Sequence, residues 1–232
     1  MERLTHRQRA YLSAMEIDVW DPRATAGSIQ SATLGDERVR EKMSLVSGDD
    51  WGDLKRRVAQ CARCELHATR TQTVFGVGDE KADWMFVGEA PGAEEDRQGL
   101  PFVGRAGRLL TAMIFALGMT RENVYIANVL KCRPPNNRDP MGEEVRQCES
   151  YLHLQVSHVQ PKIIVALGRF AAQSLVKTTR PISKLRTEVF NYNDTAIPLV
   201  VTYHPAYLLR NPLDKRKAWQ DLCLAKKVLN TT

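Results

Sequence analysis

The segment Trp84–Gly92 reads WMFVGEAPG, a short apolar run followed at once by polar and special-backbone residues. The same pattern recurs at Val124–Pro135 (VYIANVLKCRPP) and Leu199–Tyr207 (LVVTYHPAY). Each apolar run predicts a short buried strand, so Glu89, Asn128 and His204 are expected at strand carboxyl ends. Open α/β sheets bind ligands at that edge. A carboxylate, an amide and an imidazole would then share one crevice, which indicates an enzyme site.

Helical and extended patterns alternate from Trp51 onward, which predicts a layered α/β fold. We expect a three-layer α/β/α domain around a central, mostly parallel four-stranded sheet. The expected strands are Trp84–Val87, Val124–Val129, Ile163–Leu167 and Leu199–Thr202. The expected helices are Trp51–Cys61, Ala106–Leu117, Met141–His158, Arg169–Leu175 and Asp214–Leu229.

The first fifty residues differ in character from the rest, so we divide the chain into an extension, residues 1–50, and a main domain, residues 51–232. Gln8–Met15 has a helical pattern. Ala24–Thr33 lacks the apolar periodicity of a core element, which is typical of a linker. We therefore expect an N-terminal helical and linker extension ahead of the domain.

The chain has 232 residues, a net charge of +6 and a pI of about 9.1. This charge is compatible with a polyanionic partner but does not establish one. Met1–Ala10 is charged and lacks the apolar stretch of a signal peptide, and runs such as Ile163–Leu167 are too short to cross a bilayer. We expect a cytoplasmic protein with no membrane association.

The cysteines form the second constellation. Cys61 and Cys64 make a C-x-x-C pair, Cys132 precedes a double proline, and Cys148 falls on a predicted helix. Four thiols suffice for zinc or for an iron–sulfur cluster, and spacing alone does not choose between them. A redox pair at the C-x-x-C, with two ordinary buried thiols elsewhere, also fits the pattern. The fifth cysteine, Cys223, shares a helical face with Trp219, Leu222 and Lys226 and is expected to be a core thiol.

Taken together, the motifs resemble those of family 4 uracil-DNA glycosylases over roughly residues 55–229. The first motif is Gly88–Gly92 with the acidic Glu94–Asp96 and the following Leu100–Gly104, the central one is Asn128–Pro135, and the last is His204–Leu209. The four cysteines fall where that family holds a [4Fe–4S] cluster. The resemblance therefore implies removal of uracil from DNA by cleavage of the N-glycosidic bond, with a structural cluster at Cys61, Cys64, Cys132 and Cys148.

The resemblance also assigns roles in a uracil pocket. Asn128 is expected to read the uracil edge, because its amide offers an acceptor and donors that match N3–H and O4. Phe102 is expected to stack on the base, and His204 to meet the negative charge that develops at O2. The first motif is expected to line the substrate through Gly88, Ala90, Pro91 and Gly92.

Ala90 departs from other uracil-DNA glycosylases, which carry an Asp or Asn at this position to handle the attacking water. Family 4 shares the departure, so the task of orienting water or offsetting positive charge on the sugar must lie elsewhere. Glu89 and Glu95 are the candidates, and the sequence does not rank them.

Contacts to DNA are expected from the segment after His204. The resemblance places Leu208 where a side chain fills the gap left by the flipped base, with Leu209 as the alternative. Arg210 and Arg105 are expected to bind phosphates. The protein is expected to act as a monomer.

Two further hypotheses concern partners and class. Tyr11–Trp20 resembles, weakly, the short motif by which the psi subunit of the bacterial polymerase III clamp loader engages its partner, so residues 8–20 are a candidate docking segment for a replication protein. The alternative to an enzyme is a non-catalytic iron–sulfur DNA-binding module with the same fold. A relative that traps uracil-DNA covalently is disfavoured, since Asn136–Pro140 lacks the histidine of such proteins.

Overall fold

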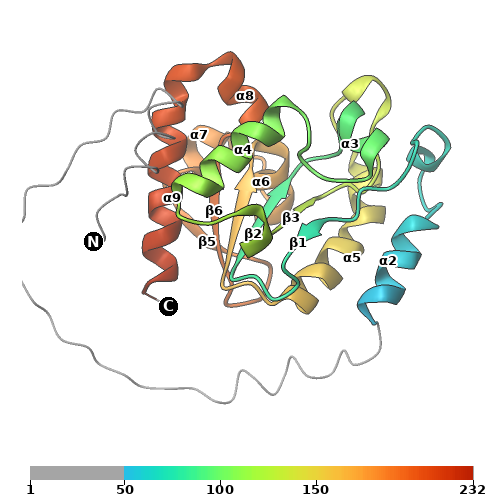
Figure 1. Ribbon diagram of the computed structural model, residues 1–232, viewed down its shortest axis with the longest axis horizontal. Helices are drawn as coiled ribbons and strands as arrows, with labels where there is room; N and C mark the ends of the chain where they lie inside the picture. The colour runs from blue at the N-terminus through green and yellow to red at the C-terminus, as the bar shows by residue number, and fades with distance from the viewer. Residues whose placement is uncertain (1–49, 232) are drawn as a thin grey trace, which may run out of the picture.

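The computed structural model describes residues 50–231. Figure 1 shows a sheet with helices on both of its faces. The six strands lie in the order β1-β3-β2-β4-β6-β5. Their bounds are β1 Val77–Gly78, β2 Trp84–Gly88, β3 Val124–Asn128, β4 Ile163–Leu167, β5 Val189–Asn191 and β6 Pro198–Thr202. The segment predicted to dock a partner, residues 8–20, lies outside the described residues.

The eight described α-helices are α2 Trp51–Ala59, α3 Ala93–Gln98, α4 Arg105–Ala116, α5 Gly142–Val159, α6 Arg169–Val176, α7 Ile182–Leu185, α8 Pro205–Arg210 and α9 Lys215–Leu229. Four short 3-10 helices connect them: η2 Glu65–Ala68, η3 Arg121–Asn123, η4 Pro135–Asn137 and η5 Pro212–Asp214. None of these described helices is long and apolar enough to cross a membrane.

The predicted three-layer fold is confirmed, because alternate residues of the central strands enter two separate cores. In β2, Trp84 and Phe86 pack with α4, α8 and α9, whereas Met85 and Val87 pack with α5, α6 and α7. Every residue of β2, β3, β4 and β6 is buried. These strands are covered on both sides, so they read as continuous apolar runs rather than alternating ones.

The four central strands are those predicted from the sequence, and all pair in parallel. The predicted number of strands is wrong, since β1 and β5 add one antiparallel strand at each edge. Both edge strands are short and at most half-buried. They therefore lack the apolar runs by which the central strands were found.

The face predicted for the C-terminal helix is also wrong. In α9 the buried residues are Ala218, Asp221, Leu222 and Ala225, while Cys223 and Lys226 are exposed. The buried stripe contains a carboxylate because Arg186 donates to both Asp221 oxygens at 2.8 Å. Apolarity alone therefore misplaced the stripe by one residue, and Cys223 is not a core thiol.

Candidate active site

The first element of the site is a close approach of two side chains over a glycine. Gly88 and Asn128 end the parallel strands β2 and β3 as direct partners. A Cβ built on Gly88 would lie 2.4 Å from Asn128 Oδ1 and 2.5 Å from Phe102 Cζ. The Asn128 amide and the Phe102 ring therefore converge over Gly88, which only a residue without a side chain permits. The structure thus brings together three residues that the resemblance assigned to the uracil pocket, Gly88, Phe102 and Asn128.

The Asn128 side chain has a buried oxygen without a hydrogen-bond partner among the described residues. The residue is 2% exposed, and the oxygen is Oδ1. A buried polar atom left unpaired costs about 1–3 kcal/mol. A ligand that carries a hydrogen-bond donor would satisfy this oxygen.

His204 lies next to the same ring. Its ring centroid is 5.6 Å from that of Phe102, and Gly168 at the end of β4 leaves room for it, since a Cβ there would lie 2.7 Å from His204 Cβ. His204 Nδ1 accepts a hydrogen bond from the Ala206 backbone N–H at 3.1 Å. Burial, helped by Arg210, lowers the His204 pKa to about 4. The imidazole is therefore neutral at pH 7, with its proton on Nε2 and available to a ligand.

The two candidate carboxylates have different surroundings. Glu89, half-buried just after β2, has its pKa raised to about 7, first by burial and then by the negative charge of Asp139, against a lowering by Arg169. Glu95 Oε1 instead accepts from the backbone N–H groups of Val103 and Gly104, at 2.9 and 3.1 Å. Glu95 thus holds the loop that carries Phe102. Among the described residues no hydrogen bond occupies the Glu89 side chain, so Glu89 can act on a proton or a charge.

The rest of the first motif shapes the turn. Gly92 leaves room for Glu95, because a Cβ on Gly92 would lie 2.7 Å from Glu95 Oε2. Ala90 packs against the apolar cluster that includes the cysteine side chains, and Pro91 is buried. Ala90 and Pro91 therefore connect the pocket to the cysteines.

Sequence reasoning missed Arg169, which pairs with Asp139 at 3.3 Å and influences Glu89. It follows the apolar run Ile163–Leu167, so the pattern used for Glu89, Asn128 and His204 contained the signal that would have found it.

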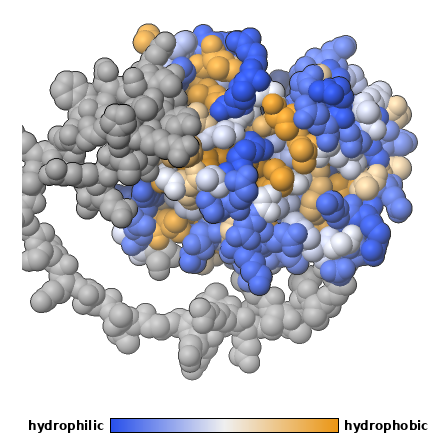
Figure 2. Space-filling model, in the orientation of Figure 1, coloured by the Kyte–Doolittle hydropathy of each residue, from blue (hydrophilic) through white to orange (hydrophobic). Residues whose placement is uncertain are grey.

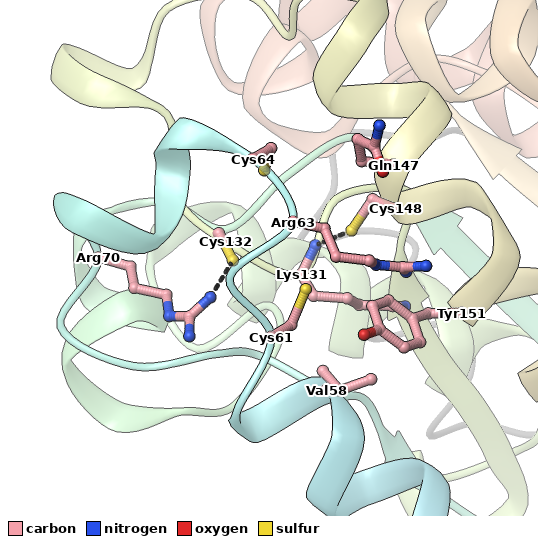
Figure 3. Close-up of a pocket in the computed structure, with 10 residues that line it drawn as sticks. All are labelled: Val58, Cys61, Arg63, Cys64, Arg70, Lys131, Cys132, Gln147, Cys148 and Tyr151. Carbon is pink, nitrogen blue, oxygen red and sulfur yellow. Dashed lines mark hydrogen bonds between the residues drawn. The ribbon is translucent and has the colours of Figure 1, made fainter.

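The cysteines meet in one cavity (Figure 3). Cys61 and Cys64 come from the segment after α2, Cys132 from the loop after β3, and Cys148 from α5. The enclosed space between these side chains is small, about 10 Å³, which is close to the room that one water molecule needs.

Four thiols line this cavity, and two of their sulfurs accept hydrogen bonds. Within residues 50–231, no three His, Cys, Asp or Glu side chains are close enough together to hold a single metal ion. The two acceptor sulfurs are Cys132 Sγ, which accepts from Arg70 at 3.0 Å, and Cys148 Sγ, which accepts from the Lys131 backbone N–H at 3.2 Å. Four cysteine thiols are a ligand set for either a zinc ion or an iron–sulfur cluster.

The predicted DNA-contact residues divide by exposure. Leu208 is fully buried in the core beneath α4 and α9, whereas its neighbour Leu209 is 37% exposed. In the described conformation, Leu208 is therefore a core residue, and Leu209 is the leucine at the surface. Arg210 and Arg105 are exposed. The sequence analysis overlooked Leu213, which is 93% exposed in η5. Figure 2 shows several apolar areas on this face of the molecule, one of them over the α8 region.

Comparison with known proteins defines the class. The family model described as the uracil DNA glycosylase superfamily matches residues 75–223. The chain is 49% identical over 168 residues to a type-4 uracil-DNA glycosylase of Archaeoglobus fulgidus, covering 69% of this chain and 83% of the relative. A type-4 uracil-DNA glycosylase of Thermotoga maritima is 47% identical over 158 residues, covering 67% and 81%. A type-5 enzyme of Pyrobaculum aerophilum is 30% identical over 193 residues, covering 68% and 83%.

The chain belongs to the uracil-DNA glycosylase superfamily. Its higher identity to type-4 than to type-5 relatives places it among the type-4 uracil-DNA glycosylases. The family predicted from the motifs is confirmed.

Proposed function

We propose that this protein is a monofunctional uracil-DNA glycosylase that hydrolyses the N-glycosidic bond of uracil in DNA, in the repair of deaminated cytosine. One observation carries the proposal: the buried, unpaired Asn128 amide oxygen lies beside the Phe102 ring. Family membership supports it. A base extruded from the duplex would stack on Phe102 and present its edge to Asn128, at an unstacking cost of a few kcal/mol.

Asn128 selects uracil over cytosine. Its Oδ1 accepts from uracil N3–H and its Nδ2 donates to O4. Cytosine carries an acceptor at N3 and a donor amine at C4, so both contacts become repulsive. Because a site built for hydrogen bonds leaves its own buried groups unpaired with the wrong ligand, this discrimination is strong.

His204 and Glu89 act on the charges that bond cleavage creates. Negative charge grows on uracil O2, and the Nε2–H of neutral His204 donates to it. Positive charge grows on the deoxyribose, and ionised Glu89 offsets it or orients the attacking water. The protein forms no covalent intermediate in this scheme. Contacts to the DNA come from Leu209, Arg210 and Arg105.

We also propose that Cys61, Cys64, Cys132 and Cys148 hold a [4Fe–4S] cluster. The fit rests on the single cavity that they line and on the hydrogen bonds to two of the sulfurs, from the Arg70 guanidinium and from the Lys131 backbone N–H. When bound, the cluster supplies a covalent cross-link between the end of α2, the loop after β3 and α5. Base hydrolysis moves no electrons, so the cluster's role is structural.

The test is release of uracil from a single-uracil oligonucleotide by protein purified at low oxygen, with alkali added to cleave abasic sites. Wild type is compared with Asn128→Ala and His204→Ala. We expect cleavage only after alkali, and strong loss in both variants. Cleavage without alkali would contradict the monofunctional assignment. No cleavage by iron-loaded protein that still binds DNA would replace the enzyme with a DNA-binding module.

A further inference from the structure

The Phe102 ring reaches the pocket through an unfavourable backbone conformation. Phe102 has φ of 54°, in the left-handed region that bulky L residues rarely adopt. Its side chain is nevertheless 7% exposed and meets Gly88 and His204. A strained residue persists only where its surroundings enforce the conformation. Something must therefore hold the backbone at this position.

Arg121, the first residue of η3, makes contacts of the required kind. Its Nη2 donates to Pro101 O at 2.8 Å and its Nη1 donates to Phe102 O at 3.1 Å. The two carbonyls belong to consecutive residues, so one rigid guanidinium fork fixes the peptide plane between them. Nη1 also lies 3.3 Å from Thr111 Oγ1 on α4, which orients the fork.

The two sides of the loop are held separately. Arg121 binds the carbonyls of Pro101 and Phe102, and Glu95 binds the next two backbone N–H groups, as described above. Gly107 completes the fit, because a Cβ there would lie 1.8 Å from Phe102 O. The backbone around Phe102 is thus held by the Arg121 guanidinium and the Glu95 carboxylate, and it packs directly on α4 at Gly107.

Arg121 also joins the loop to the strand that carries the base-reading amide. The 3-10 helix η3 runs directly into β3, which ends at Asn128. Its entry is fixed by Asn123 Oδ1, which accepts from the Thr120 backbone N–H at 2.9 Å and from its hydroxyl at 3.0 Å. A shift of the guanidinium would therefore change the position of the ring relative to Asn128.

We propose that Arg121 is a positioning residue for base recognition: it locks the strained Phe102 backbone, so that the ring lies preformed at the base-stacking position. The proposal rests on the proposed glycosylase function. Without the guanidinium, Phe102 relaxes toward negative φ and the ring leaves the face of the pocket. Stacking is present in both the ground state and the transition state, so its loss acts mainly on KM.

The first experiment measures the loop itself and needs no catalysis. Hydrogen exchange is followed by mass spectrometry in wild type, Arg121→Gln and Arg121→Lys. The control is Arg108→Gln, because Arg108 lines the same groove beside Phe102 but is exposed on α4. We expect faster exchange at Val103 and Gly104 in Arg121→Gln, an intermediate effect in Arg121→Lys and none in the control. Unchanged exchange at these amides in Arg121→Gln would overturn the proposal.

The second experiment is a double-mutant cycle with Phe102→Ala on single-uracil DNA. Arg121→Gln should lower kcat/KM by about 10- to 100-fold, the range expected for one lost base–aromatic stack, mainly through KM. In the Phe102→Ala background the same change should cost less than about twofold, since the ring it positions is gone. Equal losses in both backgrounds would mean that Arg121 acts on general stability, and would overturn the proposal. If the wild-type protein is inactive, the proposed glycosylase function is refuted. The hydrogen-exchange experiment still tests whether Arg121 holds the Phe102 backbone.

Discussion

Substituting one buried glycine gives the sharpest test of the pocket. Gly88→Ala adds a single methyl group where the Asn128 amide and the Phe102 ring meet. The backbone of Gly88 is outside the left-handed region, so the strand itself accepts an alanine. The damage should therefore be confined to the space above the strand, which is the proposed uracil site.

The size of the effect follows from the distances. The new Cβ would lie 2.4 Å from Asn128 Oδ1 and 2.5 Å from Phe102 Cζ, whereas ordinary contact begins at 3.4 Å. One or both groups must move by about 1 Å, and a misplacement of this size costs about 10²-fold in rate. Overpacking of a buried strand adds about 1–3 kcal/mol of destabilisation. We expect a folded protein with kcat/KM lowered by about 100-fold.

The assay is uracil release under single-turnover conditions, run beside a thermal melt. Gly142→Ala is the matched control, because a Cβ on Gly142 would meet only Arg146 Nη1, at 3.8 Å. It should retain wild-type activity. If Gly88→Ala folds and keeps its activity within about threefold, a range small against the loss expected for such a misplacement, uracil does not bind over Gly88 and the pocket assignment is wrong.

Further predictions concern the two leucines after His204, the ionisation of Glu89 and the cysteine ligands. Leu208→Ala should lower the free energy of unfolding by about 2–5 kcal/mol, because Leu208 is a core residue. Leu209→Ala should leave Tm unchanged and should weaken cleavage of duplex DNA more than cleavage of single-stranded DNA. Equal losses of Tm in the two variants would contradict this prediction. Wild-type activity should rise with pH through about 7 as Glu89 ionises, and Glu89→Gln should lower the rate and flatten the profile. Stability has the opposite sign: folded Glu89 keeps its proton above its ordinary pKa of 4.5, so wild-type Tm should fall relative to Glu89→Gln between pH 4.5 and about 7. A flat wild-type profile, or parallel melts, would refute these two expectations. Cys132→Ser should lower iron content and Tm, while the exposed Cys223→Ser changes neither; iron retained by Cys132→Ser would remove it from the cluster ligands.

Sequence patterns predicted the parts of the molecule that depend on burial along a continuous run. The four central strands were found because both faces of each are covered, so no polar residue interrupts the run. Edge strands β1 and β5 carry exposed positions and gave no such signal. Glu89, Asn128 and His204 were found as candidates because parallel strands deliver the residues at their ends to one edge.

The sequence did not predict which face of a helix is buried or which distant group a polar side chain binds. Leu208 and Leu209 are chemically identical, and only the packing of α8 on the core buries one and exposes the other. Glu89 and Glu95 likewise differ only in what surrounds them. Arg121 is 19 residues from the carbonyl of Phe102 that it binds, and no local pattern links such a pair.

The cysteine cavity and the proposed uracil site are connected through one short segment, and this connection offers a way for the proposed structural cluster to matter for hydrolysis. Lys131 Nζ is buried and donates to the Asn128 carbonyl at 2.8 Å and to Gln155 Oε1 at 2.5 Å, while its own backbone N–H binds Cys148 Sγ. Any centre that fixes Cys148 and the adjacent Cys132 therefore also fixes the backbone that ends in Asn128. In the proposed site the Asn128 amide distinguishes uracil from cytosine by the positions of its donor and its acceptor. Its backbone must therefore be held in place, because a small rotation would misalign both groups.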